Sequence, residues 1–447
     1  MTHEDQRDAA AAASLTLGQI AQTWWPLAVS WLLMSIEGPA HSAVVARLPN
    51  AEINLAAWGG IVFPVALIIE SPVVMLLTAS TALSKDWVAY RRLRTIAIAL
   101  GAVFTVLHAL VAFTPLYDLV ARDIIGAPAD ILEPGRLGLM IMLPWTMAIA
   151  YRRFQQGAMI RFGQTRAVGI GTAVRMTANA LVLLTGYLTR RVPGIAVASG
   201  AVAMGVIAEA AYAHIRVQPI IERQIRLAPR DPSPMSTRAF ISFYLPLALT
   251  SLISFFVSPV ISATMSRMPN ALNSLAAWPV VSGFLFVLRS PGMAFNEVVV
   301  ALLNDATAFR RLRRFATFLG ASLAVLMTIV IATPISAVWF EKVMALPTEL
   351  LSIANLALVL ALLLPPLTLL QSWFQGMIVN SKRTRAVTES VMLHLAVTIL
   401  VTGAGVVAQR YDGLLVAAAS LSIAGLAQVG WLGYRSRPVV RRLSTPT

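Results

Sequence analysis

Two long stretches of the chain repeat one another and decide its fold. Residues 24–58 read WWPLAVSWLLMSIEGPAHSAVVARLPNAEINLAAW, and residues 244–278 read YLPLALTSLISFFVSPVISATMSRMPNALNSLAAW. Both have a Pro-Leu step near the start, a second proline, an Arg-x-Pro-Asn turn and a Leu-Ala-Ala-Trp ending. A helix needs about 20 mainly apolar residues to cross a bilayer. Each stretch can therefore hold one membrane-spanning helix and the beginning of the next.

The similarity continues beyond these stretches after the loss of a single residue. The Arg-Arg-Leu-Arg run at 91–94 matches residues 310–313, and the Thr-Arg-Ala-Val run at 165–168 matches residues 384–387. Similarity that keeps nearly the same offset over such a length is the mark of an internal duplication. The sequence therefore predicts two copies of one structural unit.

The composition places both copies in a membrane. Of the 447 residues, 57% are hydrophobic and only 12% are charged, and the mean hydropathy is +0.74. Soluble proteins carry about 25% charged residues, so a soluble globular fold and a disordered chain are both excluded. The absence of cysteine also excludes disulfides, thiolate metal sites and a cysteine nucleophile.

We therefore expect an all-α polytopic membrane protein with twelve transmembrane helices, six in each copy. The expected spans are 21–46, 55–82, 93–116, 136–158, 165–187, 192–215, 238–265, 273–303, 315–338, 350–378, 385–407 and 413–434. The expected organisation is a cytoplasmic segment 1–20, a lobe 21–215, a linker 216–237, a second lobe 238–434 and a cytoplasmic tail 435–447. An even number of spans per copy makes the repeats parallel, with an axis along the membrane normal, which is a transporter architecture.

The distribution of basic residues predicts the orientation. The formal net charge is +15, and most Lys and Arg residues fall at the two termini, in the linker or in the other loops on the same side. Basic residues are retained in the cytoplasm, so both termini should be cytoplasmic, in the plasma (inner) membrane, without a nucleic-acid partner. The first apolar run is too long for a signal peptide and should stay as a helix.

No enzyme motif is found in the chain. It has no HExxH zinc motif, no GxSxG elbow and no Walker loop. We therefore expect no enzymatic activity, no cofactor and no metal site. Any transport would be driven by an ion gradient or run downhill.

Ionisable residues inside the expected spans are the candidate functional residues, because they are costly in hydrocarbon. Glu37 and His41 lie four residues apart on one face of the first span. They could hold or pass a proton or help to coordinate a cation. The alternative is a local hydrogen bond that braces the helix at Pro39.

Glu70 and Arg289 are equivalent in the two copies, each followed by Ser-Pro, and have opposite charges. They could form an ion pair that opens as the lobes move, a substrate-binding couple, or a static pair. Arg175 and His394 are equivalent in the fifth and eleventh spans and would suit an anionic group, unless they only bond to helix carbonyls. Glu209 is expected to lie at a cytoplasmic helix end, within reach of water.

The opening of each copy resembles the lobes of multidrug and toxic compound extrusion proteins. This resemblance rests on the Pro-Leu step, the run of small residues, the turn that begins with arginine and the Ala-rich second span. The wider group that the chain resembles also contains polysaccharide flippases. The Glu37-Gly38 step is most similar to progressive ankylosis-type proteins, whose association with anionic metabolites would suit Arg175 and Arg289. Drug-extrusion members commonly have an aspartate where this chain has His41. The resemblance therefore does not imply that this chain couples transport to a cation in their usual way.

These observations together predict a secondary-active transporter that exports a small organic solute by alternating access between two pseudo-symmetric lobes. Glu37, His41 and Glu70 are the candidates for coupling to H+ or Na+, and Arg175, Arg289 and His394 for substrate binding or gating. The alternatives are a lipid-linked oligosaccharide flippase and, from another class, a non-transporting membrane scaffold.

Overall fold

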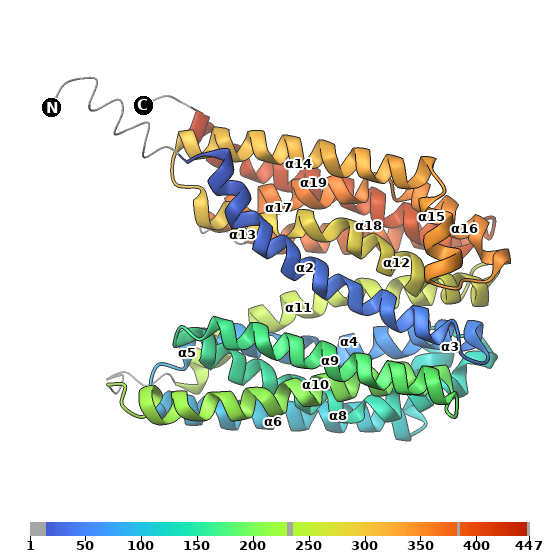
Figure 1. Cartoon of the computed structure of the whole chain (residues 1–447), viewed down its shortest axis with the longest axis horizontal. Coiled ribbons are helices and arrows are strands. Elements are labelled where there is room, and N and C mark those ends of the chain that lie inside the picture. The colour runs from blue at the N-terminus through green and yellow to red at the C-terminus, as the bar shows by residue number, and fades with distance from the viewer. Residues whose placement is uncertain (1–14, 230–235, 382–384, 445–447) are drawn as a thin grey trace. The chain divides into compact units, whose positions relative to one another are not determined.

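The computed structural model describes residues 15–229, 236–381 and 385–444, and this part of the chain contains helices and no strand (Figure 1). The first half contains α2 (Leu17–Val45), α3 (Ala51–Ala57), α4 (Phe63–Val74), α5 (Leu76–Leu83), α6 (Trp87–Phe113), α7 (Leu116–Asp118), α8 (Leu132–Arg161), α9 (Thr165–Thr189) and α10 (Gly194–Ile220), with π-helical turns at Trp58–Val62, Leu119–Ile124 and Ile221–Ile225 and a 3-10 turn at Ala129–Ile131. The second half contains α11 (Thr237–Met265), α12 (Ala271–Met293), α13 (Phe295–Leu302), α14 (Ala306–Ala332), α15 (Ile335–Val338), α16 (Thr348–Leu360), α17 (Leu364–Asn380), α18 (Arg385–Ala408) and α19 (Gly413–Ser444), with a π-helical turn at Trp339–Val343.

The helices are those of a multi-pass membrane protein. Within the described ranges, ten helical segments are long and apolar enough to cross a membrane. Two further expected spans correspond to α2 and α8, which have 29 and 30 residues. At about 1.5 Å per residue they are also long enough. They are more polar, because α2 contains Glu37 and His41 and α8 contains several arginines.

The predicted linker 216–237 is partly helical. Helix α10 continues to Ile220, and a π-helical turn follows to Ile225. Val217, Ile220, Ile221 and Ile225 are buried, so this segment has an apolar face that packs against the protein. The predicted segment 1–20, the linker and the tail 435–447 also include residues 1–14, 230–235 and 445–447, which lie outside the described residues.

Local backbone features recur at equivalent positions of the two halves. Asn50 and Asn270 both adopt left-handed backbone conformations, with φ of 54° and 52°, which asparagine tolerates better than most residues. The Asp86 carboxylate accepts bonds from the first amides of α6, and the Asp305 carboxylate accepts one from α14. An aspartate at this position satisfies amides that the helix leaves unbonded. The paired residues thus have the same local role in each half.

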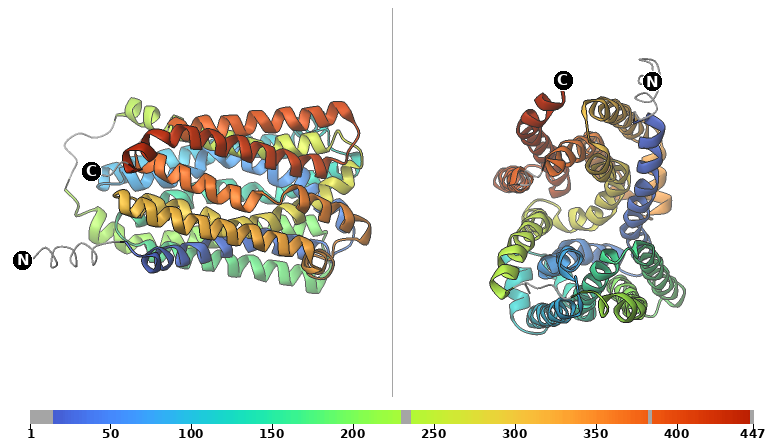
Figure 2. Two further views of the ribbon diagram at one scale, coloured as in Figure 1. Left: turned by 90° about the horizontal axis from the view of Figure 1, so that it is seen from above. Right: turned by 90° about the vertical axis from the view of Figure 1, so that its left-hand side faces the viewer.

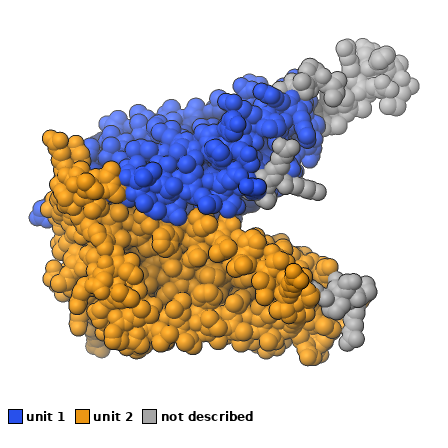
Figure 3. All heavy atoms as spheres, turned by 180° about the vertical axis from the view of Figure 1, so that it is seen from behind, with its two compact units in different colours: residues 1–39, 280–402, 414–447 blue, residues 40–279, 403–413 orange. Residues whose placement is uncertain are grey.

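The chain packs into two compact units (Figure 3). Unit 1 comprises residues 1–39, 280–402 and 414–447, and unit 2 comprises residues 40–279 and 403–413. Most of α2 therefore packs with helices of the second half, and α11 packs with helices of the first. In unit 1, the axes of the long helices α14, α18 and α19 are nearly parallel (Figures 1 and 2). The predicted lobe boundaries describe the sequence repeat and stay a prediction.

Two equivalent hydrogen bonds hold the first helix of each half to the other half. The Trp24 indole donates to the Pro291 carbonyl at 2.9 Å within unit 1. The Tyr244 hydroxyl donates to the Pro72 carbonyl at 2.5 Å within unit 2. Trp24 is equivalent to Tyr244 and Pro291 to Pro72, so each half uses the same pair of positions. The donor comes from the first helix and the carbonyl from the proline-containing second span.

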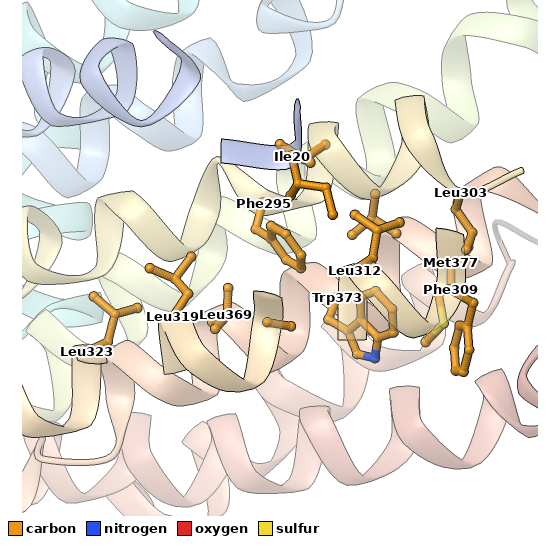
Figure 4. Packing of buried hydrophobic residues seen from close by; sticks show 13 residues of the cluster. Ile20, Phe295, Leu303, Phe309, Leu312, Leu319, Leu323, Leu369, Trp373 and Met377 are labelled. Carbon is orange, nitrogen blue, oxygen red and sulfur yellow. The ribbon is translucent and has the colours of Figure 1, made fainter. Parts of the chain in front are cut away.

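The largest apolar cluster of unit 1 joins α2 to helices of the second half. Ile20 of α2 is buried there with Phe295, Leu312 and Trp373 (Figure 4). The Phe295 and Trp373 rings stack with centroids 6.1 Å apart. Since lipid is as apolar as these side chains, their close packing is the main source of stability here.

Candidate functional site

A buried network of charged side chains lies within unit 2, where α10 packs against both α8 and α9. Its centre is Glu209 of α10, whose side chain has no solvent exposure. Arg175 of α9 places Nε 3.2 Å from Glu209 Oε2, and Arg152 of α8 donates to the same oxygen. Gln156 Nε2 donates to Glu209 Oε1 at 2.8 Å. One carboxylate therefore binds two cations and an amide.

Glycine brings these helices close enough for the network to form. At Gly205 of α10, an added Cβ would lie 3.1 Å from the Arg175 carbonyl oxygen. At Gly171 of α9, it would lie 3.5 Å from Cγ of Glu209. Small residues at a membrane helix interface allow such an approach. The distance at Gly205 is shorter than an ordinary contact, so a larger residue there would push α10 away from Arg175.

The sequence-based prediction for Glu209 was wrong. It was expected at a water-exposed helix end, whereas the structure buries it completely. Arg152 was not among the candidate residues, and α8, which continues to Arg161, buries this arginine. The spacing of Arg152 and Gln156, four residues apart on one helix, was the available sign that both face a common partner.

Glu70 belongs to the same region of unit 2. It lies on α4, is 4% exposed, and interacts electrostatically with Arg153 and Arg152 of α8. Its Oε2 atom has no hydrogen-bond partner among the described residues. Unit 2 thus gathers two carboxylates and three guanidinium groups from four helices.

The equivalent position in unit 1 has a different environment. The Nε atom of Arg289, on α12, donates to Thr368 Oγ1 of α17 at 2.7 Å. Thr368 Oγ1 in turn donates to the Leu364 carbonyl at 2.8 Å, which fixes its position. His394 of α18 interacts electrostatically with Arg289, and the nearby Gln428 amide donates to Ser390 Oγ at 3.5 Å. Among the described residues of unit 1, no carboxylate forms an ion pair with Arg289.

The predicted residue pairs are therefore distributed as follows. Glu70 lies in unit 2 and Arg289 in unit 1, and each has partners inside its own unit, so a Glu70–Arg289 pair stays a prediction. Arg175 binds Glu209, whereas its equivalent, His394, lies beside Arg289. The same helix positions thus gather polar side chains in both halves, but with different charges.

Glu37 and His41 both lie on α2, which continues through Pro39 to Val45. The His41 side chain is buried, and its ring stacks on Trp58 with centroids 6.0 Å apart and planes at 13°. This contact fixes the imidazole near the start of the second span. Proton handling by Glu37 and His41 stays a prediction. In the part of the chain that the structure describes, no three His, Asp or Glu residues form a possible metal site.

Comparison with known proteins defines the class of fold. No protein-family model matches the chain, and no curated protein matches its sequence. Solved structures do match over nearly the whole chain, and they include transporters of the MATE family and the MOP superfamily and a lipid II flippase. The chain therefore has the all-helical fold that these structures share, as its sequence predicted.

Three solved structures illustrate the similarity. An inward-facing multidrug resistance MATE family transporter of the MOP superfamily has a TM-score of 0.70 at 12% identity, covering 93% of this chain and 98% of that one. The lipid II flippase MurJ, in an inward closed conformation, has a TM-score of 0.71 at 15% identity, covering 94% and 90%. A MOP superfamily transporter from Pyrococcus furiosus has a TM-score of 0.63 at 14% identity, covering 94% and 97%.

Proposed function

We propose that this protein is a secondary-active membrane transporter that exports a small organic solute by alternating access between two pseudo-symmetric lobes. The observation that carries the proposal is the combination of a complete transporter fold with charged side chains buried in both halves. The lobes would be residues 21–215 and 238–434, with twelve spans in all. Both termini would be cytoplasmic, in the plasma (inner) membrane.

The buried charges support transport because a membrane protein retains them against a cost of about 2.5–3.5 kcal/mol each on insertion scales. Glu37, His41 and Glu70 are the proposed coupling residues for H+ or Na+. Arg175, Arg289 and His394 are the proposed substrate or gate residues. Basic side chains in this second group favour an anionic solute, as does the resemblance to progressive ankylosis-type proteins.

A lipid-linked oligosaccharide flippase is the second candidate. The observation that favours it is the similarity to the lipid II flippase MurJ, which is as close in fold as the similarity to the MATE transporter. A flippase would move a lipid-linked substrate between the leaflets, whereas an exporter would release a soluble solute into the opposite compartment.

Transport in proteoliposomes with imposed pH or sodium gradients tests the proposal. Succinate, glucose 6-phosphate and ethidium would serve as soluble probes, and a fluorescent lipid-linked oligosaccharide as the flippase probe. We expect gradient-driven movement of a soluble probe, which Glu37→Gln abolishes while binding remains measurable. The matched control is Glu341→Gln, which removes an exposed carboxylate beyond the expected spans and paired with Lys342.

Each contrary result has a clear meaning. Movement of only the lipid-linked probe would favour the flippase. Movement of no probe under any gradient would favour a non-transporting scaffold. If Glu37→Gln transports with an unchanged dependence on pH, the carboxylate braces α2 and does not couple transport to protons.

A further inference from the structure

Equivalent positions of the two halves differ in charge balance. The first half has two carboxylates and three guanidinium groups in its buried network. At the equivalent positions of the second half, only Arg289 has a permanent charge. The equivalent residues are Glu70 and Arg289, Arg152 and Gln371, Arg153 and Ser372, Arg175 and His394, and Glu209 and Gln428.

In the first half the arginines are already engaged. Arg152 and Arg175 both bind the Glu209 carboxylate, and Arg153 interacts electrostatically with Glu70 and Glu209. A solute anion would have to compete with these carboxylates for the same guanidinium groups. The network of unit 2 is therefore poorly suited to bind a second anion.

In the second half, Arg289 is hydrogen-bonded but has no carboxylate partner in its own unit. Its Nε atom donates to Thr368, while Nη1 and Nη2 donate to none of the described residues of unit 1. These two nitrogens form the planar fork that binds a carboxylate or a phosphate through two parallel hydrogen bonds. Thr368 thus orients the guanidinium and leaves its fork available.

We propose that Arg289 binds a carboxylate or phosphate group of the transported solute and that Thr368 positions it. The arginines of unit 2 would instead hold that unit together. This inference rests on the proposed transport function and narrows it, because it assigns the anion to one half and to one residue. His394, which interacts electrostatically with Arg289, would contribute a polar group to the same site.

The first test compares thermal unfolding of two variants of the purified full-length protein without added ligand. Arg289→Met removes a cation that lacks a carboxylate, and Thr368 keeps its bond to Leu364. We expect an unchanged or higher Tm. Arg152→Met is the matched control, because it makes the same change at an arginine that binds Glu209, and should lower the Tm. An equal fall in both variants would show that Arg289 has a structural counter-ion, such as Glu70, and would overturn the proposal.

The second test measures anion binding by the same proteins. Succinate or inorganic phosphate should raise the Tm of the unaltered protein, whereas tetraethylammonium chloride at equal ionic strength should not. Arg289→Met should abolish the shift and Arg289→Lys should weaken it, since lysine keeps the charge but loses the fork. Arg152→Met should keep the shift. No shift with either anion, or a shift that survives Arg289→Met, would refute the site.

Transport measurements separate this inference from the proposed function. If the unaltered protein transports succinate or glucose 6-phosphate and Arg289→Met transports the same probe equally well, the anion site is refuted and the transport function stands. If the unaltered protein binds succinate or phosphate through Arg289 but moves no solute, the transport function is refuted and the site stands.

Discussion

Replacing Glu209 with glutamine should destabilise the protein strongly, although glutamine has almost the same shape. The side chain is fully buried and binds Arg152, Arg175 and Gln156. Removing one partner of a buried ion pair costs about 3–5 kcal/mol, because the remaining charge is left uncompensated. The new amide can still accept one hydrogen bond, worth about 1 kcal/mol. We therefore expect a loss of about 3 kcal/mol in the free energy of unfolding.

The measurement is reversible unfolding of the reconstituted protein by denaturant, compared between variants. Glu389→Gln is the matched control, because Glu389 also contacts two arginines, Arg385 and Arg435, but is 27% exposed. Exposed ion pairs contribute about 0–1 kcal/mol, so this variant should lose less than about 1 kcal/mol. Similar losses for the two variants would refute the argument from burial.

A double variant tests whether the lost energy comes from the ion pair. Glu209→Gln combined with Arg175→His introduces the residues that the second half has at the equivalent positions, Gln428 and His394. We expect the double variant to recover about half of the loss, since one of the two uncompensated cations is replaced by a weaker base. Strictly additive losses would show that Glu209 and Arg175 do not interact.

Three further predictions concern the two halves. If Glu70 and Arg289 meet in some conformation, the double variant Glu70→Gln with Arg289→Gln should be less impaired in transport than the two single effects added together; additive effects would exclude the pair. Topology reporters at the C-terminus and within 216–237 should both report cytoplasm, and an external reading for either would overturn the predicted orientation. Trp24→Phe and Tyr244→Phe should each lower stability by about 1 kcal/mol in denaturant unfolding, since each loses one bond to a proline carbonyl; unequal effects would argue against equivalent roles.

The sequence alone was sufficient to predict the class of fold. Hydropathy is a local property, so apolar runs long enough to cross a membrane can be recognised without knowing how they pack. The duplication is also visible in the sequence, and it pairs Glu70 with Arg289 and Arg175 with His394. These two properties led to the all-helical, transporter-like fold that the solved structures share.

Only the tertiary structure decided which charges meet. The rotation of each helix and its distance from its neighbours determine whether Glu209 faces water or two arginines, and neither quantity follows from hydropathy. Close contact at Gly205 brings Arg175 to Glu209, while Arg289 meets a threonine hydroxyl and no carboxylate of its own unit. The packing of α2 and α11 with the opposite halves is equally invisible in the repeat. Duplicated sequences share their helices, but each copy's side-chain contacts depend on the residues it has changed since.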